Sequence, residues 1–333
     1  MYLNANSRIT IGSVRFHSVN LVEIETSVKE LEGIATIILP RNFVTKDKKG
    51  VTDFIKKEDA VTIELGYNGN YHTEFTGYVD VIGSDTPLVI ECDNEWMKHK
   101  KNSLSKSWEK ATLKEVLSFA LTGYTIDCPD VNLGKFLIKS ASTFETVKGL
   151  MRSVGFFTKL NEASKKVSCY WPYDSQNYAI HQYVFGSRNE EKLKALKLWP
   201  NIRKNRLTFK VKDDVKIHIT AKCITKAGKH LKVEIGSADK DAEKRTRNYG
   251  HEIENETQLR EAAERDLKRW TYGGYRGSIS GFGSPRTVAG DTLKLRDIDN
   301  PERESSYLIE KVKITYDAEQ ANFIRDNILS YKV

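Results

Sequence analysis

The sequence carries one strand pattern twice, once toward each end. The first copy reads Asp59-Ala60-Val61-Thr62-Ile63-Glu64-Leu65, followed by Phe75-Thr76-Gly77-Tyr78-Val79-Asp80-Val81-Ile82. The second reads Gly290-Asp291-Thr292-Leu293-Lys294-Leu295, followed by Tyr307-Leu308-Ile309-Glu310-Lys311-Val312-Lys313-Ile314. Each copy has an acidic turn, an alternating strand, a short polar excursion and a second alternating strand, and this period of two is typical of strands with one buried face. Two similar β units in one polypeptide predict a ring-forming structural protein, because a few chains then supply twice as many similar positions.

The alternation extends around the first copy. Val, Ile and Thr alternate with polar residues through 7–39, and Pro40 ends the last of these strands. Asn68-Gly69 marks a hairpin turn. Residues 1–95 are therefore predicted to form a tube-like antiparallel β-barrel with a long polar loop from Lys46 to Asp59, and with further strands at 60–66, 73–82 and 87–92.

A second tube-like barrel is predicted for residues 201–333. One long helix is expected at about 256–270, because Asn255 is a good N-cap and Gln258 follows three residues later. Its apolar stripe consists of Leu259, Ala263, Leu267 and Trp270. We expect strands from about 205 to 235 and then at 275–282, 291–297 and 306–316.

The period of the pattern changes between the two barrels. Thr112 with Glu115, and Ser142 with Glu145, are capping boxes, each followed by apolar residues at helical spacing. A hairpin is expected after Gly155. Residues 96–200 are therefore predicted to be a small α+β insert domain, and the predicted fold class is mainly β, with two barrels related by an internal pseudo-repeat and a small helix–hairpin domain.

Composition agrees with a globular protein of more than one domain. The chain has 333 residues, of which 39% are hydrophobic and 29% charged. No apolar run approaches the roughly 20 residues of a membrane-spanning helix, and the N-terminus lacks a secretory pattern. We therefore expect synthesis in a cytoplasm. The four cysteines, which form no metal-binding cluster, are expected to be reduced and mostly buried: Cys92, Cys128, Cys169 and Cys223.

The formal net charge of +8 leaves two interpretations of the basic clusters. They either contact nucleic acid or an acidic protein, or they are solvated loops. No aromatic residues interleave with them as base stacking requires. The clusters lie at Lys98-His99-Lys100-Lys101, Arg203-Lys204-Asn205-Arg206 and Lys244-Arg245-Thr246-Arg247.

No catalytic, cofactor or metal site is predicted. Gly281-Phe282-Gly283 does not lead from a strand into a helix, so turn glycines are a better account than phosphate binding. His251-Glu252 begins like a zinc-protease motif, but Asn255 stands where the second histidine belongs. The remaining histidines are scattered: His17, His72, His99, His181, His218 and His230. The alternating Glu252, Glu254 and Glu256 suit a solvated helix start better than a glycosidase pair.

The ordered motifs of the chain resemble those of phage baseplate hub proteins. These are the tail hubs of Mu-like and other contractile-tailed phages, called late control protein D or tail protein D, and the type VI secretion spike carries a similar module. The resemblance covers most of the chain. It rests on Leu39-Pro40, Glu64-Leu65-Gly66-Tyr67, Phe75-Thr76-Gly77-Tyr78-Val79, Pro87 to Asp93, the helix from Ser142 to Gly155, Ala262 to Trp270, Gly281-Phe282-Gly283-Ser284-Pro285, Gly290-Asp291 and Tyr307 to Val312.

The resemblance implies a homotrimer whose three chains present six similar units around a channel. Such a ring joins a sixfold tail tube to a threefold central spike in the virion baseplate, with the tape-measure protein as a further neighbour and nucleic acid present only in passage. Glu58-Asp59 departs from the family's Gly-Asp, so that turn is expected to be built differently. No spike domain follows the second barrel, which implies a separate spike protein.

Two other functions remain open at this point. The first is a tail-associated cell-wall hydrolase or carbohydrate-binding component, and the second is nucleic-acid binding through the basic clusters. Lysis of bacterial walls by the purified chain would support the hydrolase. A mobility shift of DNA would support nucleic-acid binding. The subunit interface itself is not predicted from the sequence.

Overall fold

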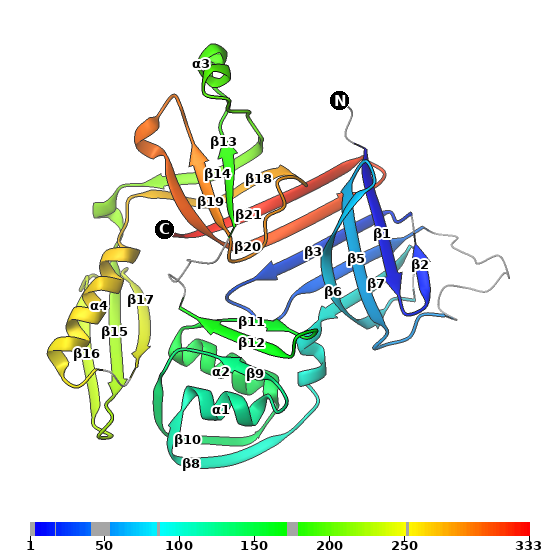
Figure 1. Cartoon of the computed structure of the whole chain (residues 1–333). Coiled ribbons are helices and arrows are strands. Elements are labelled where there is room, and N and C mark those ends of the chain that lie inside the picture. Colours follow the sequence, from blue (N-terminus) through cyan, green and yellow to red (C-terminus); the bar gives the residue numbers. More distant parts are fainter. Residues whose placement is uncertain (1–3, 17, 41–53, 85–86, 172–178, 251–252) are drawn as a thin grey trace.

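A computed structural model describes residues 4–333 except 17, 41–53, 85–86, 172–178 and 251–252. A large β-sheet runs through the middle of the molecule, and two smaller units lie beside it (Figure 1). The sheet has 13 strands, and eleven of them follow the hydrogen-bonded order β14-β18-β21-β20-β3-β4-β7-β6-β5-β1-β2. β19 pairs with β20, and β13 pairs with β19.

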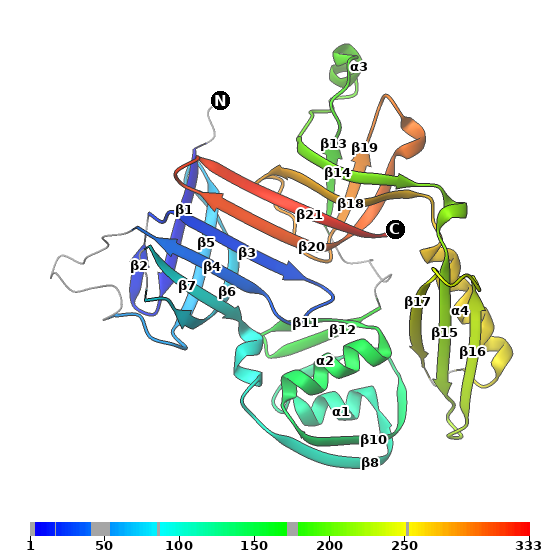
Figure 2. The ribbon, with the colours of Figure 1, turned by 180° about the vertical axis from the view of Figure 1, so that it is seen from behind.

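The sheet consists of an N-module and a C-module. The N-module strands are β1 (Ala5–Ile11), β2 (Val14–Phe16), β3 (Leu21–Ser27), β4 (Ile34–Leu39), β5 (Ala60–Tyr67), β6 (Asn70–Ile82) and β7 (Leu88–Asn94). The C-module strands are β13 (Ile180–Val184), β14 (Ile202–Lys210), β18 (Gly274–Phe282), β19 (Thr292–Arg296), β20 (Ser305–Asp317) and β21 (Asn322–Lys332). Figure 2 shows the strands of the two modules side by side, from β21 and β20 to β3, β4 and β7.

The two modules repeat one topology. The N-module path β3-β4-β7-β6-β5-β1 corresponds, strand for strand and in chain order, to the C-module path β14-β18-β21-β20-β19-β13. The last pair differs, since β1 is antiparallel to β5 while β13 is parallel to β19. The mainly β class and the expected pseudo-repeat are therefore confirmed, and the two modules are halves of one continuous sheet.

One hydrophobic core crosses both modules. It contains Ile63 and Ile90 from the N-module together with Tyr183, Ile309 and Leu329 from the C-module. Period-two alternation explains this core, since inward side chains are buried along β5 and β20 while their neighbours stay half-exposed. The division of the chain at residues 95 and 200 stays a prediction, because the modules share this core.

The α+β unit follows β7. Its helices are α1 (Leu113–Ala120) and α2 (Thr143–Val154), and both predicted capping boxes are present, at Thr112 and Ser142. Gly155 ends α2 with a φ of 88°. The remaining elements are η2 (Glu95–His99), β8 (Leu104–Thr112), β9 (Thr125–Asp127), β10 (Asn132–Ala141), β11 (Phe157–Asn161) and β12 (Lys166–Tyr170).

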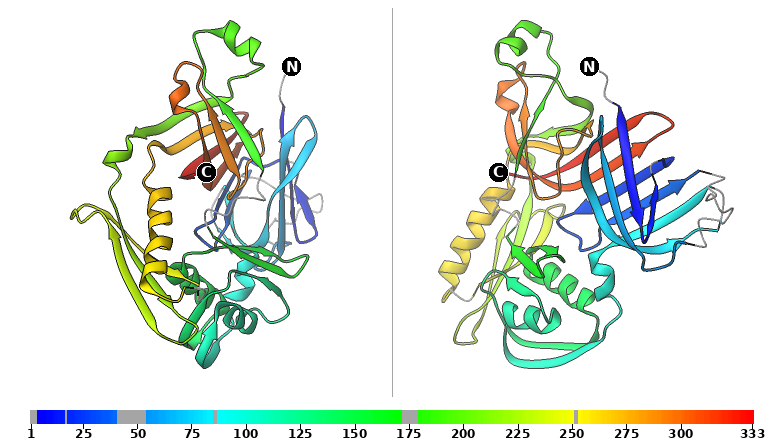
Figure 3. Two further views of the ribbon diagram at one scale, coloured as in Figure 1. Left: turned by 60° about the vertical axis from the view of Figure 1, so that its left-hand side comes forward. Right: turned by 45° about the vertical axis from the view of Figure 1, so that its right-hand side comes forward.

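A second unit lies between β14 and β18 in the chain. We expected its strands to complete the second barrel, but β15 (Ile217–Ile224), β16 (His230–Gly236) and β17 (Glu243–Tyr249) form a separate sheet. Helix α4 (Glu256–Trp270), predicted over the same residues, lies along this sheet (Figure 3) and buries its apolar face with Leu259 and Ala263. The apolar residues of β15, β16 and β17 therefore pack against α4 and not in the core of the large sheet.

Short helices complete the described chain: α3 (Glu190–Ala195), η3 (Lys212–Asp214) and η4 (Pro301–Arg303). None of the described helices is long and apolar enough to cross a membrane. The predicted polar loop from Lys46 to Asp59 lies largely outside the described residues.

Candidate assembly interface

The N-module and the C-module meet where β3 pairs with β20, and we call this pairing the inner seam. Residues 21–27 run antiparallel to residues 311–317, with Ile24 opposite Ile314 in the core face. On the other face, Glu25 lies 2.5 Å from the Lys311 ammonium and Glu23 lies 3.1 Å from that of Lys313. The two lysines and two glutamates are 32–41% exposed, so each pair is worth roughly 0.2–1 kcal/mol. The backbone ladder and the buried isoleucines hold the seam.

Arg325 of β21 provides a second, buried connection between the modules. Its side chain is 1% exposed and pairs with the Glu74 carboxylate of β6, which is equally buried. Its remaining donors reach the Gly283 carbonyl at 2.7 Å and the Thr287 carbonyl at 3.1 Å. A buried ion pair is tolerated when its other hydrogen bonds are satisfied. Arg325 therefore ties β6 to the loop that follows β18.

Gly281-Phe282-Gly283 contributes to this junction by close packing. A Cβ on Gly283 would lie 2.2 Å from the ring of Phe323, so only glycine fits there. The Gly283 N–H donates to the Tyr67 hydroxyl at 3.1 Å, and this hydroxyl donates to the Phe323 carbonyl at 3.1 Å. Burial raises the pKa of Tyr67, which keeps the hydroxyl protonated as a donor. Gly281 lies inside strand β18 and Gly283 directly follows it, so close packing at a strand end, rather than the expected turn or a phosphate loop, accounts for these glycines.

The acidic turns of the two modules have the same hydrogen bonds. The Asp59 carboxylate accepts the Lys56 N–H at 2.8 Å, and the Asp291 carboxylate accepts the Val288 N–H at 3.1 Å. The residue before each aspartate has a positive φ, 73° at Glu58 and 100° at Gly290. We expected Glu58-Asp59 to build a different turn, and this was wrong, because Glu58 adopts the left-handed backbone that glycine adopts in the other copy.

These turns fix the equivalence of positions between modules. The Val79 N–H donates to the Asp59 carbonyl, just as the Ile309 N–H donates to the Asp291 carbonyl. Both strands then contain the same β-bulge. Val79 and Val81 oppose Cys92 and Glu91, while Ile309 and Lys311 oppose Leu329 and Ile328. Val79 therefore corresponds to Ile309, and Cys92 to Leu329.

The counterpart of the inner seam is open in the single chain. β14 corresponds to β3, and within the described part of the chain its outer edge pairs with no strand. Val211, just after β14, is 57% exposed, whereas Val28, in the corresponding place after β3, is 5% exposed. β6 corresponds to β20, and its Val81 is 45% exposed. An unpaired strand edge is a ready template for another chain.

The candidate histidines and glutamates that the structure describes form no metal-binding group of three. His181 lies 2.8 Å from Asp291 in the C-module turn, a contact that the scattered spacing did not reveal. Glu254 and Glu256 are exposed beside the Asn255 cap, as expected for a solvated helix start. His17, His251 and Glu252 lie outside the described residues. Among the residues that the structure describes, no group of three metal-ligating side chains occurs.

All four cysteines are reduced thiols, as predicted. Cys92, Cys169 and Cys223 are buried, and Cys128 is half-buried. Burial raises the pKa of Cys92 and of Cys169 to about 12 and that of Cys128 to about 11. A thiol with such a pKa is a poor nucleophile at neutral pH.

The second and third basic clusters lie on strands, whereas the first spans the end of η2. Lys100 pairs with Asp93 and Lys101 with Glu58, both next to η2. The second cluster lies on the open edge strand β14, and the third lies on β17.

Comparisons with known proteins identify the fold. A tail protein from Neisseria meningitidis MC58 superposes with a TM-score of 0.63 at 12% identity, covering 99% of this chain and 97% of that one. The 43 kDa tail protein of prophage MuSo2 from Shewanella oneidensis gives a TM-score of 0.61 at 14% identity, covering 98% and 97%. An Escherichia coli component of the type VI secretion system, which is similar in structure to T4 bacteriophage tail proteins, gives 0.57 at 9% identity, covering 97% and 76%.

No known family model matches the sequence, and no curated protein matches it. The likeness to tail proteins is therefore a likeness of fold, which spans almost the whole chain. The resemblance noted in the sequence is confirmed at that level.

Proposed function

We propose that this chain is the structural baseplate hub of a phage or prophage contractile tail, or of a related contractile injection machine. Three copies close a ring with pseudo-sixfold symmetry, because each chain supplies two modules of one topology. The ring joins the tail tube to the central spike, with the end of the tape-measure protein nearby. Its role in the virion tail is structural rather than enzymatic.

The observation that carries this proposal is the inner seam. Within one chain, β20 of the C-module pairs with β3 of the N-module. The pseudo-repeat makes β6 the counterpart of β20 and β14 the counterpart of β3. A second seam of the same kind, between β14 of one chain and β6 of the next, closes a ring that leaves neither edge unpaired.

The equivalent positions give this outer seam a register. Leu207 corresponds to Ile24, since both oppose matching residues of the next strand, Gly277 and Ala35. Ser84 corresponds to Ile314, because each lies five residues after the equivalent pair Val79 and Ile309. Ile24 and Ile314 are partners in the inner seam. The outer seam therefore pairs Leu207 with Ser84, Phe209 with Ile82 and Lys210 with Val81 of a second copy.

Burial and charge support this register. It covers Val211 by the next chain, as Val28 is covered by Leu308 of β20 together with Phe157 of β11. It also brings the basic outward face of β14, which carries Arg206 and Lys210, toward Glu91 on β7 of the next chain. The inner seam joins an acidic strand to a basic one in the same manner. Complementary charges of this kind favour one partner and one register.

The outward face of the sheet, opposite the hydrophobic core, would line the channel of the ring. This face carries the paired charges of the inner seam, Glu23 and Glu25 with Lys311 and Lys313. Such a lining is close to neutral along the seam and offers little attraction for a polyanion.

The first experiment measures the number of copies and their symmetry. Native mass spectrometry of the purified chain, with negative-stain class averages, is expected to give three copies in a ring with six similar densities. A protein that stays monomeric at tens of micromolar, or an assembly that is not annular, would contradict the proposal.

The second experiment tests the outer seam by cysteine cross-linking in a Cys128→Ser background. Lys210→Cys combined with Val81→Cys is expected to give disulfide-linked dimers and trimers on a non-reducing gel. The control combines Val81→Cys with Lys194→Cys on the exposed surface of α3, and it is expected to stay uncross-linked. A ring without these cross-links would disprove the register but not the hub.

A further inference from the structure

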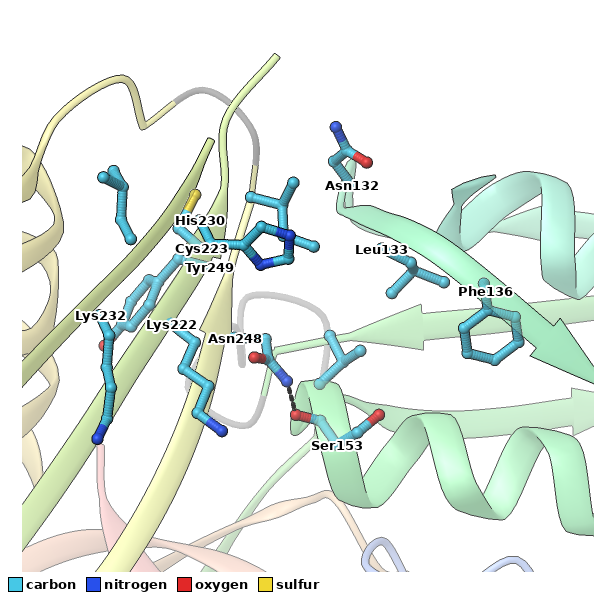
Figure 4. Close-up of a pocket in the computed structure, with 13 residues that line it drawn as sticks. Asn132, Leu133, Phe136, Ser153, Lys222, Cys223, His230, Lys232, Asn248 and Tyr249 are labelled. Carbon is cyan, nitrogen blue, oxygen red and sulfur yellow. Dashed lines mark hydrogen bonds between the residues drawn. The ribbon is translucent and has the colours of Figure 1, made fainter. Parts of the chain in front are cut away.

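A cleft of about 450 Å³ separates the two smaller units, and none of its lining residues belongs to the inner seam or to the proposed outer seam. One wall comes from β10 and the end of α2, and the other from the face of the β15–β17 sheet that α4 does not cover (Figure 4). Its volume falls within the roughly 300–1,000 Å³ typical of ligand sites. The two walls differ in chemistry.

The wall on β10 and α2 is apolar. Leu133 and Phe136 are partly buried against the core of the α+β unit, and Val154 at the end of α2 is 1% exposed. Figure 4 shows Leu133 and Phe136 opposite His230 across the cleft. This wall suits an aliphatic or aromatic side chain.

The wall on the β15–β17 sheet is basic. Lys222 of β15 lies directly opposite Lys232 of β16, and His230 lies beside them at the mouth of the hairpin. Like charges directly opposite each other destabilise a sheet. Lys232 is 2.7 Å from Glu234, but Lys222 has no carboxylate partner among the described residues. The residues lining the cleft include neither aspartate nor glutamate.

The cleft is held open by contacts between its walls at both ends. Asn248 of β17 donates to the Ser153 carbonyl at the end of α2, and nearby Arg247 donates to the Gly155 carbonyl at 3.0 Å. At the other end, the Asn132 amide donates to the Thr225 carbonyl at 3.4 Å. These contacts hold the two units in a fixed arrangement, and this arrangement leaves Lys222 facing the cleft without a carboxylate partner among the described residues.

We propose that this cleft binds an extended segment of a partner polypeptide in which acidic and apolar residues alternate. In an extended chain successive side chains point to opposite sides, so the acidic ones meet Lys222 and the apolar ones meet Leu133 and Phe136. Removing the repulsion between Lys222 and Lys232 adds to the binding. A single-stranded nucleic acid is less suitable, because base stacking uses successive exposed aromatic rings, whereas Phe136 and His230 lie on opposite walls (Figure 4) and Tyr249 is buried.

The test uses fluorescein-labelled eight-residue peptides that alternate Glu or Asp with Leu, Val or Phe, titrated with the full chain by anisotropy. At least one acidic peptide is expected to bind at least tenfold more tightly than its Lys-substituted counterpart, with affinity falling as salt is added. If every acidic peptide binds no better than its Lys counterpart, the proposal is overturned.

Matched variants locate the binding. Lys222→Glu is expected to weaken the best peptide at least tenfold, and so is Leu133→Ser on the opposite wall. Lys226→Glu makes the same charge change at an exposed position of the β15–β16 turn outside the cleft, and it is expected to change the affinity less than twofold. Equal effects of Lys222→Glu and Lys226→Glu would show mere charge attraction and overturn the proposal.

Two other occupants are outcomes of the same titrations. A single-stranded oligonucleotide that competes more strongly than the best peptide would assign the cleft to nucleic acid. Peptide binding to a monomeric Val211→Asp variant but not to the assembled ring would assign it to a second copy of this chain. Either result would overturn the proposal without affecting the hub.

Discussion

Leu88 and Ile90 of the N-module occupy the places in β7 that Arg325 and Asn327 occupy in β21 of the C-module. Ile90 and Asn327 are both 0% exposed, so one topology holds two kinds of core. Asn327 donates to the Tyr183 hydroxyl at 3.0 Å and accepts from the Thr287 hydroxyl at 2.6 Å. The N-module is held by apolar contact, whereas the C-module adds a polar network that requires specific partners.

The polar network lies where the two modules join. Arg325 pairs with the Glu74 carboxylate of the N-module. The equivalent contact in the other direction would need a charged side chain at position 88, where the N-module has a leucine. The two modules share one strand order, but they differ in the direction of their last strand pair and in the buried contacts that hold the core. A buried charged group must keep its hydrogen-bond partners at fixed positions, so this junction has a more definite geometry than apolar contact alone would give.

The most severe test of this contrast is Arg325→Leu, which gives the C-module the leucine of the N-module. It leaves Glu74 buried without its cation, so the free energy of unfolding is expected to fall by about 3–5 kcal/mol. Urea titration followed by tryptophan fluorescence measures this. Arg286→Leu is the control, because Arg286 lies 3.4 Å from the same carboxylate but is 40% exposed, and a loss below about 1 kcal/mol is expected.

A loss below about 1 kcal/mol for Arg325→Leu would mean that Glu74 finds water or another donor, and the polar fastening would then be dispensable. The double variant Arg325→Leu with Glu74→Leu removes both charges. It is expected to recover part of the lost stability, because no unpaired buried charge remains.

The polar core also explains why β21 was not predicted. Its inward residues are Phe323, Arg325, Asn327 and Leu329, while Ile324 and Ile328 face outward and are half-exposed. Hydrophobic periodicity assumes that apolar side chains point inward, and here the pattern is mixed on both faces. A local signal for β21 does exist in the turn before it, where the Asp317 carboxylate accepts the N–H groups of Glu319 and Gln320 and so starts a hairpin.

The second test places one charge at two equivalent positions. Val28→Asp puts a carboxylate at a site that is 5% exposed, and it is expected to destabilise the single chain by about 3 kcal/mol. Val211→Asp puts it at a site that is 57% exposed, and it is expected to change chain stability by less than about 0.5 kcal/mol but to prevent ring assembly. Urea titration and native mass spectrometry separate the two effects.

Leu137→Asp serves as the control for Val211→Asp. Leu137 is 64% exposed on β10 and lies outside both seams, so the ring is expected to form normally. Loss of the ring in both variants, or in neither, would contradict the outer seam.

Local features of the fold were predictable, and the seams were not. The capping boxes at Thr112 and Ser142 use residues three apart, so a short stretch of sequence contains the whole interaction. The inner seam pairs Ile24 with Ile314, and no local pattern encodes the partner of a strand so far along the chain. The repeat itself was visible because both acidic turns are local, and they were the basis for expecting two similar modules.

The third test concerns these turns. Gly290→Ala places a side chain at a φ of 100° and is expected to cost about 1–2 kcal/mol of unfolding free energy. Glu58→Gly relieves a φ of 73° but increases the freedom of the unfolded chain, so it is expected to lie within about 1 kcal/mol of the parent. Thermal unfolding measures both. An equal loss in both variants would mean that the ion pair of Glu58 with Lys101, rather than backbone conformation, sets the stability of the N-module turn.

The smallest expected effect is a difference in thiol labelling rate between positions 92 and 329. Cys92 and Leu329 are equivalent core positions of the two modules and are 2% and 6% exposed. Burial raises the pKa of Cys92 to about 12, so almost no thiolate exists at pH 8, and labelling by a disulfide reagent is expected to be much slower than for half-buried Cys128. Labelling of Cys128 is expected to quicken as the pH rises toward its pKa of about 11. Leu329→Cys in a Cys92→Ser and Cys128→Ser background places the same reporter in the C-module. We expect equal labelling rates at the two positions, because a shared core requires both modules to open together. A tenfold faster rate at residue 329 would mean that the C-module core opens on its own.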